Sequence, residues 1–201
     1  MALEKRRILP ARVVYVSTSG VYGDCAGERV DESRPPAPQT ERAKRRLDAE
    51  RQLALWCSAR GAALVVLRAP GIYAAERLPL ARLRARAPVL RAEDDVYTSH
   101  IHADDLAAAL VRSLEDDAPA GIYNACDDSE LRMGDWMDLV AERCGLARPP
   151  RLARAQMPEP SSFMMESRRL DNRKLKQVLG LRLLYPSVHE GLRHAEAAGV
   201  H

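Results

Sequence analysis

Two apolar runs on either side of a helical segment constrain this chain most. Residues 12–17 (R-V-V-Y-V-S) and 62–68 (A-A-L-V-V-L-R) are apolar at successive positions, which is typical of parallel strands covered on both faces. Residues 41–59 between them carry apolar side chains at a helical period, with Thr40 placed to cap the start and Gly61 to mark the end. Strand, helix and strand within about 55 residues predict a βαβ unit in a parallel sheet.

The segments after this unit indicate one more strand and several helices. Asp104 and Asp105 fall in the first turn of one helix, where the helix dipole favours acidic side chains. The Arg-rich segment 76–91 is expected to be helical as far as Ala87 and broken by Pro88. The expected elements are helices at 76–87, 102–114, 132–144, 171–180 and 187–198, a strand at 121–125, and a loop at 148–167.

Composition and charge exclude several classes of protein. The 31 Lys and Arg are balanced by 28 Asp and Glu and are not interleaved with aromatic residues, which argues against a nucleic-acid surface. The four cysteines form no C-x-x-C pair and have no His at metal-ligand spacing, so we expect reduced thiols and no metal site. The first 12 residues lack the apolar core of a signal peptide, and no apolar run approaches the roughly 20 residues that span a bilayer. These features predict a cytoplasmic protein that binds neither membrane nor nucleic acid.

Four segments resemble, in order, motifs of one enzyme family. They are V-S-T-S-G-V-Y-G (residues 16–23), V-L-R-A-P-G-I-Y (66–73), S-H-I-H-A-D-D-L-A (99–107) and G-I-Y-N-A-C-D (121–127). Their family counterparts are the strand end with the active-site Ser or Thr, the L-R-x-x-x-x-Y-G segment beside the nicotinamide, the I-H-V-x-D-L-A motif and a late G-x-x-N strand. Together they resemble the extended short-chain dehydrogenase/reductase family, also called the NAD-dependent epimerase/dehydratase family.

The resemblance implies an α/β fold: the C-terminal part of a Rossmann-like, doubly wound parallel sheet with a small, mainly helical substrate lobe. The implied domains are a partial NAD(P)-binding domain at residues 1–72, joined again by residues 98–126, and a substrate-binding lobe at 73–201. The family's chemistry implies NAD or NADP as cofactor. The implied activity is that of an epimerase/dehydratase-like oxidoreductase on a nucleotide-sugar-like substrate or another small carbonyl or alcohol compound.

Two departures from the family pattern bear on activity. The Y-x-x-x-K pair of the family is matched to T-E-R-A-K, which puts Thr40 at the tyrosine position and keeps Lys44. A threonine hydroxyl cannot act as the acid or base near neutral pH, and Tyr22 or Tyr73 would have to replace the phenol. The chain also has no G-x-x-G-x-x-G, the loop that binds the cofactor pyrophosphate. We therefore expect the first four strands of the family sheet to be absent, and this chain alone to bind cofactor weakly or not at all.

The resemblance also implies roles for individual residues. The implied catalytic residues are Thr18 and Lys44, the cofactor-binding residues are Ser17, Thr18, Lys44, Pro70, Gly71 and Ile72, and the substrate-binding residues are Ser19, Tyr73 and Arg82.

Each role has a structural alternative. Thr18 either bonds a substrate oxygen or caps the end of a strand, and Lys44 either contacts the cofactor ribose or lies on a solvated helix face. Residues 70–72 either line the nicotinamide or form a turn after a strand. The arginines around Arg82 either grip a diphosphate or face solvent.

Two interpretations other than an enzyme stay open. The protein is either a non-catalytic sensor or partner-recruiting module on the same fold, or an inactive gene fragment. Strand 12–17 is apolar on both faces, so an open edge there would recruit another chain. The expected partner is a second copy of this chain or the missing N-terminal half.

Overall fold

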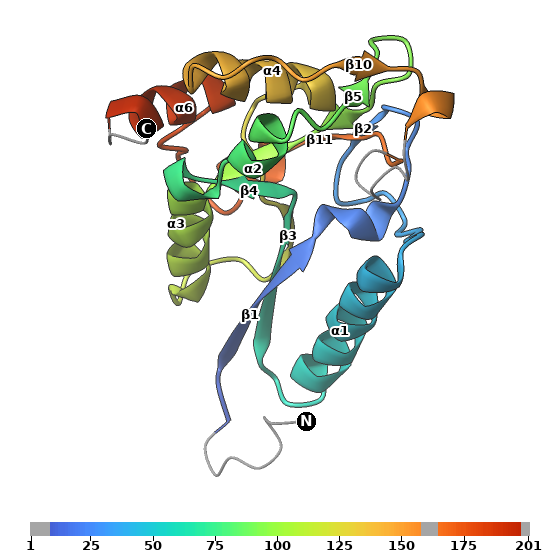
Figure 1. The fold of residues 1–201 in the computed structure, drawn as a ribbon. Helices are drawn as coiled ribbons and strands as arrows, with labels where there is room; N and C mark the ends of the chain where they lie inside the picture. The colour runs from blue at the N-terminus through green and yellow to red at the C-terminus, as the bar shows by residue number, and fades with distance from the viewer. Residues whose placement is uncertain (1–8, 158–164, 198–201) are drawn as a thin grey trace.

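A computed structural model describes residues 9–157 and 165–197 and contains a sheet of three parallel strands, two of which, β1 (Arg12–Thr18) and β3 (Ala63–Ala69), lie side by side in Figure 1. Strand β1 pairs in parallel with β3 over all seven residues of each. Strand β8 (Gly121–Asn124) pairs in parallel with the other side of β3. The order β1-β3-β8 confirms the βαβ unit and the third strand that the sequence predicts.

Two helices cover opposite faces of this sheet. Figure 1 shows α1 (Glu41–Ser58) on one side of β1 and β3 and α3 (Ala103–Leu114) on the other. The period of two along a strand explains the arrangement: Val65 and Leu67 pack in one core with α3, whereas Arg68 reaches α1. The sheet is therefore doubly wound, as expected.

The ends of both helices are fixed by local hydrogen bonds. Thr40 accepts a hydrogen bond from the backbone N–H of Ala43 at 3.2 Å and caps α1 as expected. His102 Nδ1 accepts one from the N–H of Asp104 at 3.2 Å and caps α3. In the same turn, buried Asp105 accepts from the N–H groups of residues 184 and 185 at 2.6 and 3.0 Å, which ties α3 to the C-terminal segment.

Short elements form a smaller lobe above the carboxyl ends of the sheet. Four two-stranded ribbons pair segments far apart in sequence, and the helices pack around them. The ribbons are β4 (Gly71–Tyr73) with β7 (His100–His102), β5 (Val89–Leu90) with β10 (Arg151–Leu152), β2 (Arg29–Val30) with β11 (Arg169–Leu170), and β6 (Tyr97–Thr98) with β9 (Leu131–Arg132). The helices are α2 (Leu80–Arg84), α4 (Met133–Arg143) and α6 (Val188–Ala197), with 3-10 turns η2 (Ser19–Tyr22), η3 (Ala75–Arg77) and η4 (Arg154–Gln156). Helix α5 (Arg173–Gln177) packs instead on β8 of the central sheet.

The Arg-rich segment differs from the expected single helix. It forms η3 and then the five-residue α2, because Pro79 lies between them and Leu78 before it is extended (φ −67°, ψ 150°). A residue before proline is driven out of the helical region, so the helix cannot continue. The expected loop 148–167 contains β10 and η4. Its residues 158–164, residue 198 of the last expected helix and the first eight residues lie outside the described part.

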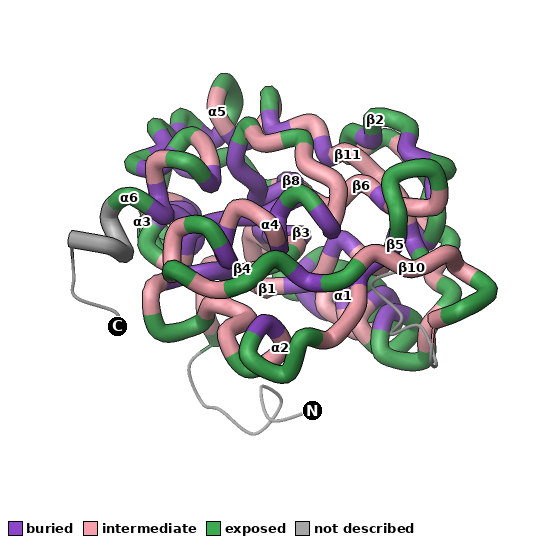
Figure 2. The backbone as a smooth tube through the Cα atoms, turned by 45° about the horizontal axis from the view of Figure 1, so that its top comes forward, coloured by how far each residue is buried: buried purple, intermediate pink, exposed green. Residues whose placement is uncertain are grey.

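Burial is greatest in the middle strand. Five of the seven residues of β3 are buried, whereas six of the seven in β1 are only partly buried. Figure 2 shows the exposed positions concentrated on the connecting segments and outer helix faces. Within the described residues β1 pairs with β3 alone, so β1 is an edge strand with apolar side chains on both faces. No helix in the described ranges is long and apolar enough to cross a membrane.

A buried ion pair joins α1 to the middle strand. Arg68 donates to both carboxylate oxygens of Glu50, at 3.2 and 2.7 Å, and the two side chains are 3% and 6% exposed. The guanidinium carbon lies 4.8 Å from the centroid of the Tyr22 ring, whose hydroxyl donates to Asn124 Oδ1 at 2.8 Å. One polar chain therefore connects α1, β3, η2 and β8 inside the core.

Replacing one partner of this pair should cost far more than replacing an exposed acid on the same helix. Glu50→Gln leaves the Arg68 charge buried without its counter-charge, and we expect the free energy of unfolding to fall by about 3–5 kcal/mol. Urea denaturation followed by circular dichroism measures the change. Glu41→Gln, which removes the exposed partner of Lys44, is the control and should cost less than about 1 kcal/mol. Equal losses for the two variants would contradict the prediction.

Candidate functional site

A cavity of about 430 Å³ opens between the carboxyl ends of β1 and β3 and the smaller lobe. Parallel α/β sheets bind ligands at this edge, because the loops that follow the strands diverge there. Its wall includes seven of the residues that the sequence singles out. They are Thr18, Ser19, Pro70, Gly71, Ile72, Tyr73 and Arg82.

Thr18 and Ser19 enter the cavity where β1 runs into η2. Thr18 Oγ1 accepts a hydrogen bond from the N–H of Gly20 at 3.2 Å, so Thr18 caps η2 and lines the cavity at once. Gly23 ends the turn with φ +70°, and a Cβ at that position would overlap the carbonyl oxygen of Ala37. The turn is therefore held in one conformation, with the Thr18 hydroxyl at the cavity wall.

Residues 70–73 form the wall opposite. Gly71 lies so close to His100 that a Cβ on it would be 3.0 Å from His100 Cδ2, so the backbone itself lines the cavity. Tyr73 is buried, and its hydroxyl lies 3.4 Å from the carbonyl oxygen of Ser187. Burial, reinforced by the nearby carboxyl of Asp127, raises the pKa of the Tyr73 phenol far above its usual value. This phenol therefore stays protonated at neutral pH.

Tyr22, the other phenol considered as a proton donor, is not among the cavity-lining residues. Its side chain is 1% exposed, and its hydroxyl is bonded to Asn124 Oδ1 in the core. Burial raises the pKa of Tyr22 to about 12. Neither of the two tyrosines offers a group that titrates near neutral pH.

Three expected site residues do not line this cavity. Ser17 is buried beneath it, and its Oγ has no hydrogen-bond partner among the described residues. Thr40 is the cap of α1, and Lys44 is 53% exposed with its ammonium 2.8 Å from Glu41. On α1 it is Arg42 that lines the cavity.

Helix geometry explains why Arg42 lines the cavity and Lys44 does not. Each residue of an α-helix turns the side chain by about 100°, so a shift of two residues moves it to the opposite side. Four residues beyond Arg42, and therefore on nearly the same face, Arg46 donates to the carbonyl oxygen of Val16 at 3.1 Å. The face of α1 that meets the end of β1 thus carries two arginines in place of Thr40 and Lys44.

The sequence reasoning missed further residues of the wall, among them Glu166, Arg168, His100 and Trp136. Arg168 donates to Glu166 at 2.7 Å, and its Nη2 lies 3.5 Å from Ser19 Oγ, across 149 positions of sequence. A contact between residues so far apart in the sequence leaves no pattern in neighbouring residues from which it could be predicted. His100 and Trp136 lie with ring centroids 4.4 Å apart, and their burial resembles that of ordinary core residues.

The charge of the cavity wall is strongly positive. Four arginines and one glutamate line it, a formal excess of three positive charges, and Glu166 is already paired with Arg168. The four arginines are Arg42, Arg77, Arg82 and Arg168. His100 adds no charge, because burial lowers its pKa to about 3 and the imidazole is neutral. Such a wall favours an anionic ligand.

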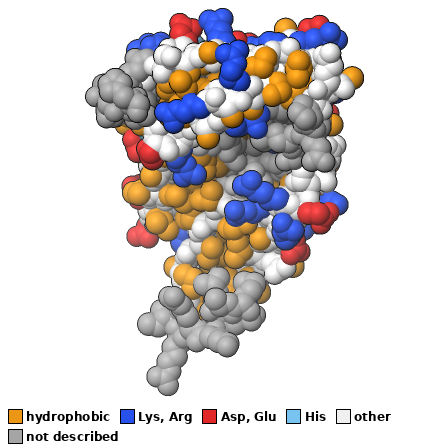
Figure 3. All heavy atoms as spheres, in the orientation of Figure 1, with side chains coloured by type: hydrophobic (Ala, Val, Ile, Leu, Met, Phe, Trp, Pro, Cys, Tyr) orange, Lys and Arg blue, Asp and Glu red, His pale blue; other side chains and the backbone are white. Residues whose placement is uncertain are grey.

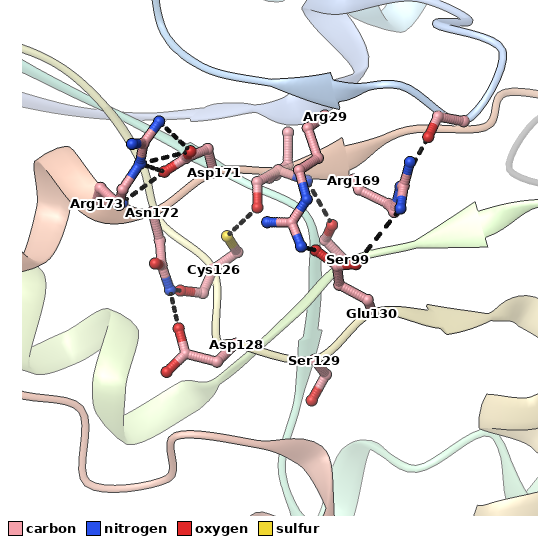
Figure 4. Close-up of polar contacts among 12 residues, drawn as sticks. Arg29, Ser99, Cys126, Asp128, Ser129, Glu130, Arg169, Asp171, Asn172 and Arg173 are labelled. Carbon is pink, nitrogen blue, oxygen red and sulfur yellow. Dashed lines mark hydrogen bonds and ion pairs between the residues drawn. The ribbon is translucent and has the colours of Figure 1, made fainter.

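A second cavity, of about 510 Å³, is lined by residues of α5 and by several ion-paired side chains, whose polar contacts Figure 4 shows. Asn172 donates to the Cys126 carbonyl oxygen at 2.9 Å and to Asp128 at 2.8 Å, while Arg29 pairs with Glu130 at 2.6 Å. Lys176 pairs with Asp128 at 2.7 Å and Arg173 with Asp171 at 2.7 Å, so these charges balance one another, which indicates a structural network. In the described residues, no group of His, Cys, Asp and Glu could hold a metal ion.

Asp127 at the second cavity is the exception to this balance. It is 3% exposed; Oδ1 accepts from the N–H of Ser129 at 2.9 Å, and Oδ2 has no partner among the described residues. Burial raises its pKa to about 8.

The sequence matches the model of the NAD dependent epimerase/dehydratase family over residues 1–126. A functionally unknown conserved protein from Silicibacter pomeroyi DSS is 33% identical, with a TM-score of 0.81 over 94% of this chain and 67% of that one. MoeE5, solved with UDP-glucuronic acid and NAD, is 25% identical, with a TM-score of 0.74 over 94% of this chain and 66% of its own.

The UDP-glucose 4-epimerase of Thermus thermophilus, solved with NAD, is also 25% identical, with a TM-score of 0.72 over 93% of this chain and 64% of its own. This chain therefore spans about two thirds of the length of these structures. No curated protein matches it.

The Asp127 carboxyl should make stability depend on pH in a defined direction. Below about pH 4 the group is protonated in the folded and unfolded states alike, and as the pH rises towards 8 only the unfolded chain ionises, so the folded state loses stability. Asp127→Asn removes this loss. We expect the variant to gain roughly 2 kcal/mol relative to the parent between pH 5 and pH 7, measured by urea unfolding at each pH. Asp128→Asn, at a side chain that is 45% exposed, should show no such gain.

Proposed function

This chain belongs to the NAD dependent epimerase/dehydratase family, and we propose that its cavity serves NAD(P)-dependent oxidoreductase chemistry. The proposed substrate is nucleotide-sugar-like or another small carbonyl or alcohol compound. The observation that carries the proposal is that Thr18, residues 70–73 and Arg82 meet in one cavity at the carboxyl edge of the sheet. The nucleotide-sugar part is supported by the UDP-sugar complexes of MoeE5 and by the arginine-rich wall.

Part of a cofactor site is available in these residues. Pro70, Gly71 and Ile72 would hold the nicotinamide end, since Gly71 presents bare backbone to the cavity. A bound nicotinamide supplies a hydride donor or acceptor. The chain has no G-x-x-G-x-x-G for the pyrophosphate, so the 201 residues alone should bind NAD or NADP weakly.

Thr18 is the residue we propose to orient the substrate. Its Oγ1 accepts from the N–H of Gly20, which leaves the hydroxyl proton to donate to a substrate oxygen in the cavity. Two titratable groups of the wall are displaced from neutral, since burial raises the pKa of Tyr73 and lowers that of His100. Arg42 stays protonated at any physiological pH and cannot act as the base. Binding and orientation are thus better supported than rapid turnover.

The pKa values of Tyr73 and His100, both far from neutral, also favour a second candidate, a non-catalytic binding module on this fold. A cavity that binds a ligand through arginines and hydroxyls is sufficient for a sensor. Turnover that depends on the Thr18 hydroxyl distinguishes the two candidates.

We also propose a polypeptide partner for the edge of β1. Large apolar side chains are exposed on the two helices that flank the strand: Leu55 (74%) on α1, and Val111 (64%) and Leu114 (60%) on α3. Figure 3 shows hydrophobic side chains gathered over the part of the surface where Figure 1 places β1. An open strand edge with an apolar surround pairs readily with another strand, from a second copy or from a separate chain.

Thr18→Val tests the proposed activity, because it keeps the β-branched shape and removes the hydroxyl. Oxidation of UDP-sugars and simple sugars with NAD or NADP is followed by absorbance of the reduced nicotinamide. We expect kcat/KM to fall at least about tenfold, the loss for a missing hydrogen bond to the reacting oxygen. Ser58→Ala, which removes an exposed hydroxyl at the end of α1 outside the wall, is the control and should keep the parent activity. Absence of turnover in the parent across this panel would support the binding module instead.

Sedimentation velocity tests the proposed partner. We expect the chain to self-associate at tens of micromolar, since pairing at β1 covers backbone groups and apolar surface together. Val13→Lys places a charge on the edge strand and should shift the population towards monomer, whereas Leu184→Lys, at a separate side chain that is 67% exposed, should not. A parent chain that stays a cooperatively folding monomer at this concentration would exclude a second copy as the partner.

A further inference from the structure

We propose that the Thr18–Ser19 end of the cavity is a subsite for a polyhydroxylated anion that carries an acidic group close to a free hydroxyl. Arg42 and Arg168 would bind the acidic group, and Glu166 would accept a hydrogen bond from the hydroxyl. The inference rests on the proposed function in taking this cavity as the substrate cavity, and it narrows the class of substrate.

Arg168 is held firmly at this end of the cavity. Its Nη1 donates to the Gly23 carbonyl oxygen at 2.8 Å and to Glu166 Oε2 at 2.7 Å, and its Nη2 lies 3.5 Å from Ser19 Oγ. The side chain is 15% exposed. A guanidinium fixed in this way loses little conformational freedom when it binds an anion, and its planar edge suits a carboxylate or a phosphate.

Glu166 carries an acceptor that the described residues leave unused. Its side chain is 8% exposed and lines the cavity; Oε2 pairs with Arg168, whereas Oε1 is buried and has no hydrogen-bond partner in the described part of the chain. A buried carboxylate oxygen without a donor is costly. A hydroxyl on the ligand, placed beside the group that Arg168 binds, would supply the missing donor.

Arg42 brings a second positive charge to the same end. The first turn of α1 packs on η2, since a Cβ on Gly20 would lie 3.6 Å from the Cβ of Ala43. Arg42 precedes Ala43 and lines the cavity, and within the described residues it forms no ion pair. It is exposed, so it can turn towards an incoming anion. Two arginines, one from α1 and one from the segment before β11, are therefore available to the acidic group in this wall.

The rest of the wall suits a sugar-like body. Met133, Trp136 and Met137 form an apolar side, against which the C–H face of a sugar can pack. Two kinds of ligand satisfy this chemistry, a sugar acid with a carboxylate and a sugar phosphate. Both carry a negative charge that the arginines can bind, whereas a neutral sugar carries none.

Isothermal titration of the 201-residue chain at low ionic strength, without cofactor, tests the subsite. The probes are gluconate, glucose 6-phosphate, glucose and acetate. We expect gluconate or glucose 6-phosphate to bind at least about tenfold more tightly than glucose, because an ionic hydrogen bond contributes about 1.5–3 kcal/mol. The stronger of the two identifies carboxylate or phosphate as the preferred group. Acetate should bind more weakly than gluconate, because it lacks the hydroxyls.

Variants separate the residues. Arg42→Gln and Arg168→Gln should each weaken binding of the preferred anion about tenfold, and Arg45→Gln, the same charge change at an exposed position of α1 outside the wall, should leave it unchanged. Glu166→Gln should lower the ratio of gluconate to acetate affinity several-fold, because a neutral amide accepts a hydroxyl less strongly and repels a plain anion less. Arg168→Gln also removes a bond to Gly23, so the exposed Arg42 carries the test if that variant does not fold.

Equal affinities for glucose and for both anionic sugars, or equal losses for Arg42→Gln and Arg45→Gln, would overturn the subsite. Binding as expected with no redox turnover on NAD or NADP would instead leave the subsite standing and count against the proposed oxidoreductase activity.

Discussion

Thr18 lies opposite Ala69 because β1 and β3 pair in parallel along their full length, and this register places the ends of both strands at one level. The residues that follow, Ser19 on one strand and Pro70 on the other, must then diverge from the same edge. The cavity occupies the space between them, closed above by the smaller lobe. A slip of one residue would turn the Thr18 hydroxyl to the other face of the sheet and remove it from the wall.

The chain of polar contacts from Glu50 through Arg68 and Tyr22 to Asn124 keeps the elements of this edge in place. A buried ion pair adds little net stability over apolar packing, but it tolerates only one arrangement of its partners. In this molecule it fixes the angle between α1 and β3, and with it the direction in which the first turn of α1 faces. The position of Arg42 at the cavity is a consequence of that angle.

Local patterns predicted the βαβ unit, the third strand and the cap at Thr40, because buried strands and amphipathic helices carry their signal in consecutive residues. The break at Pro79 was missed although proline is visible in the sequence, since the arginines around it favour a helix by composition. Lys44 was placed at the site by matching a four-residue spacing that Arg42 and Arg46 also satisfy, and only the helix orientation distinguishes the two registers. Arg168, which is paired with Glu166, meets Ser19 through a contact that no local pattern encodes.

An arginine at the cavity end of α1 changes what the site can do in two linked ways. Its charge is permanent, so it cannot exchange a proton with a substrate hydroxyl as a phenol can. The same permanence makes it an anion-binding group at every physiological pH, in the same cavity wall as the fixed guanidinium of Arg168 and the unused oxygen of Glu166. At this position of the wall, the inability to exchange a proton and the ability to bind an anion thus have one physical origin. A ligand that brings its own negative charge would be retained by this wall whether or not hydride transfer follows.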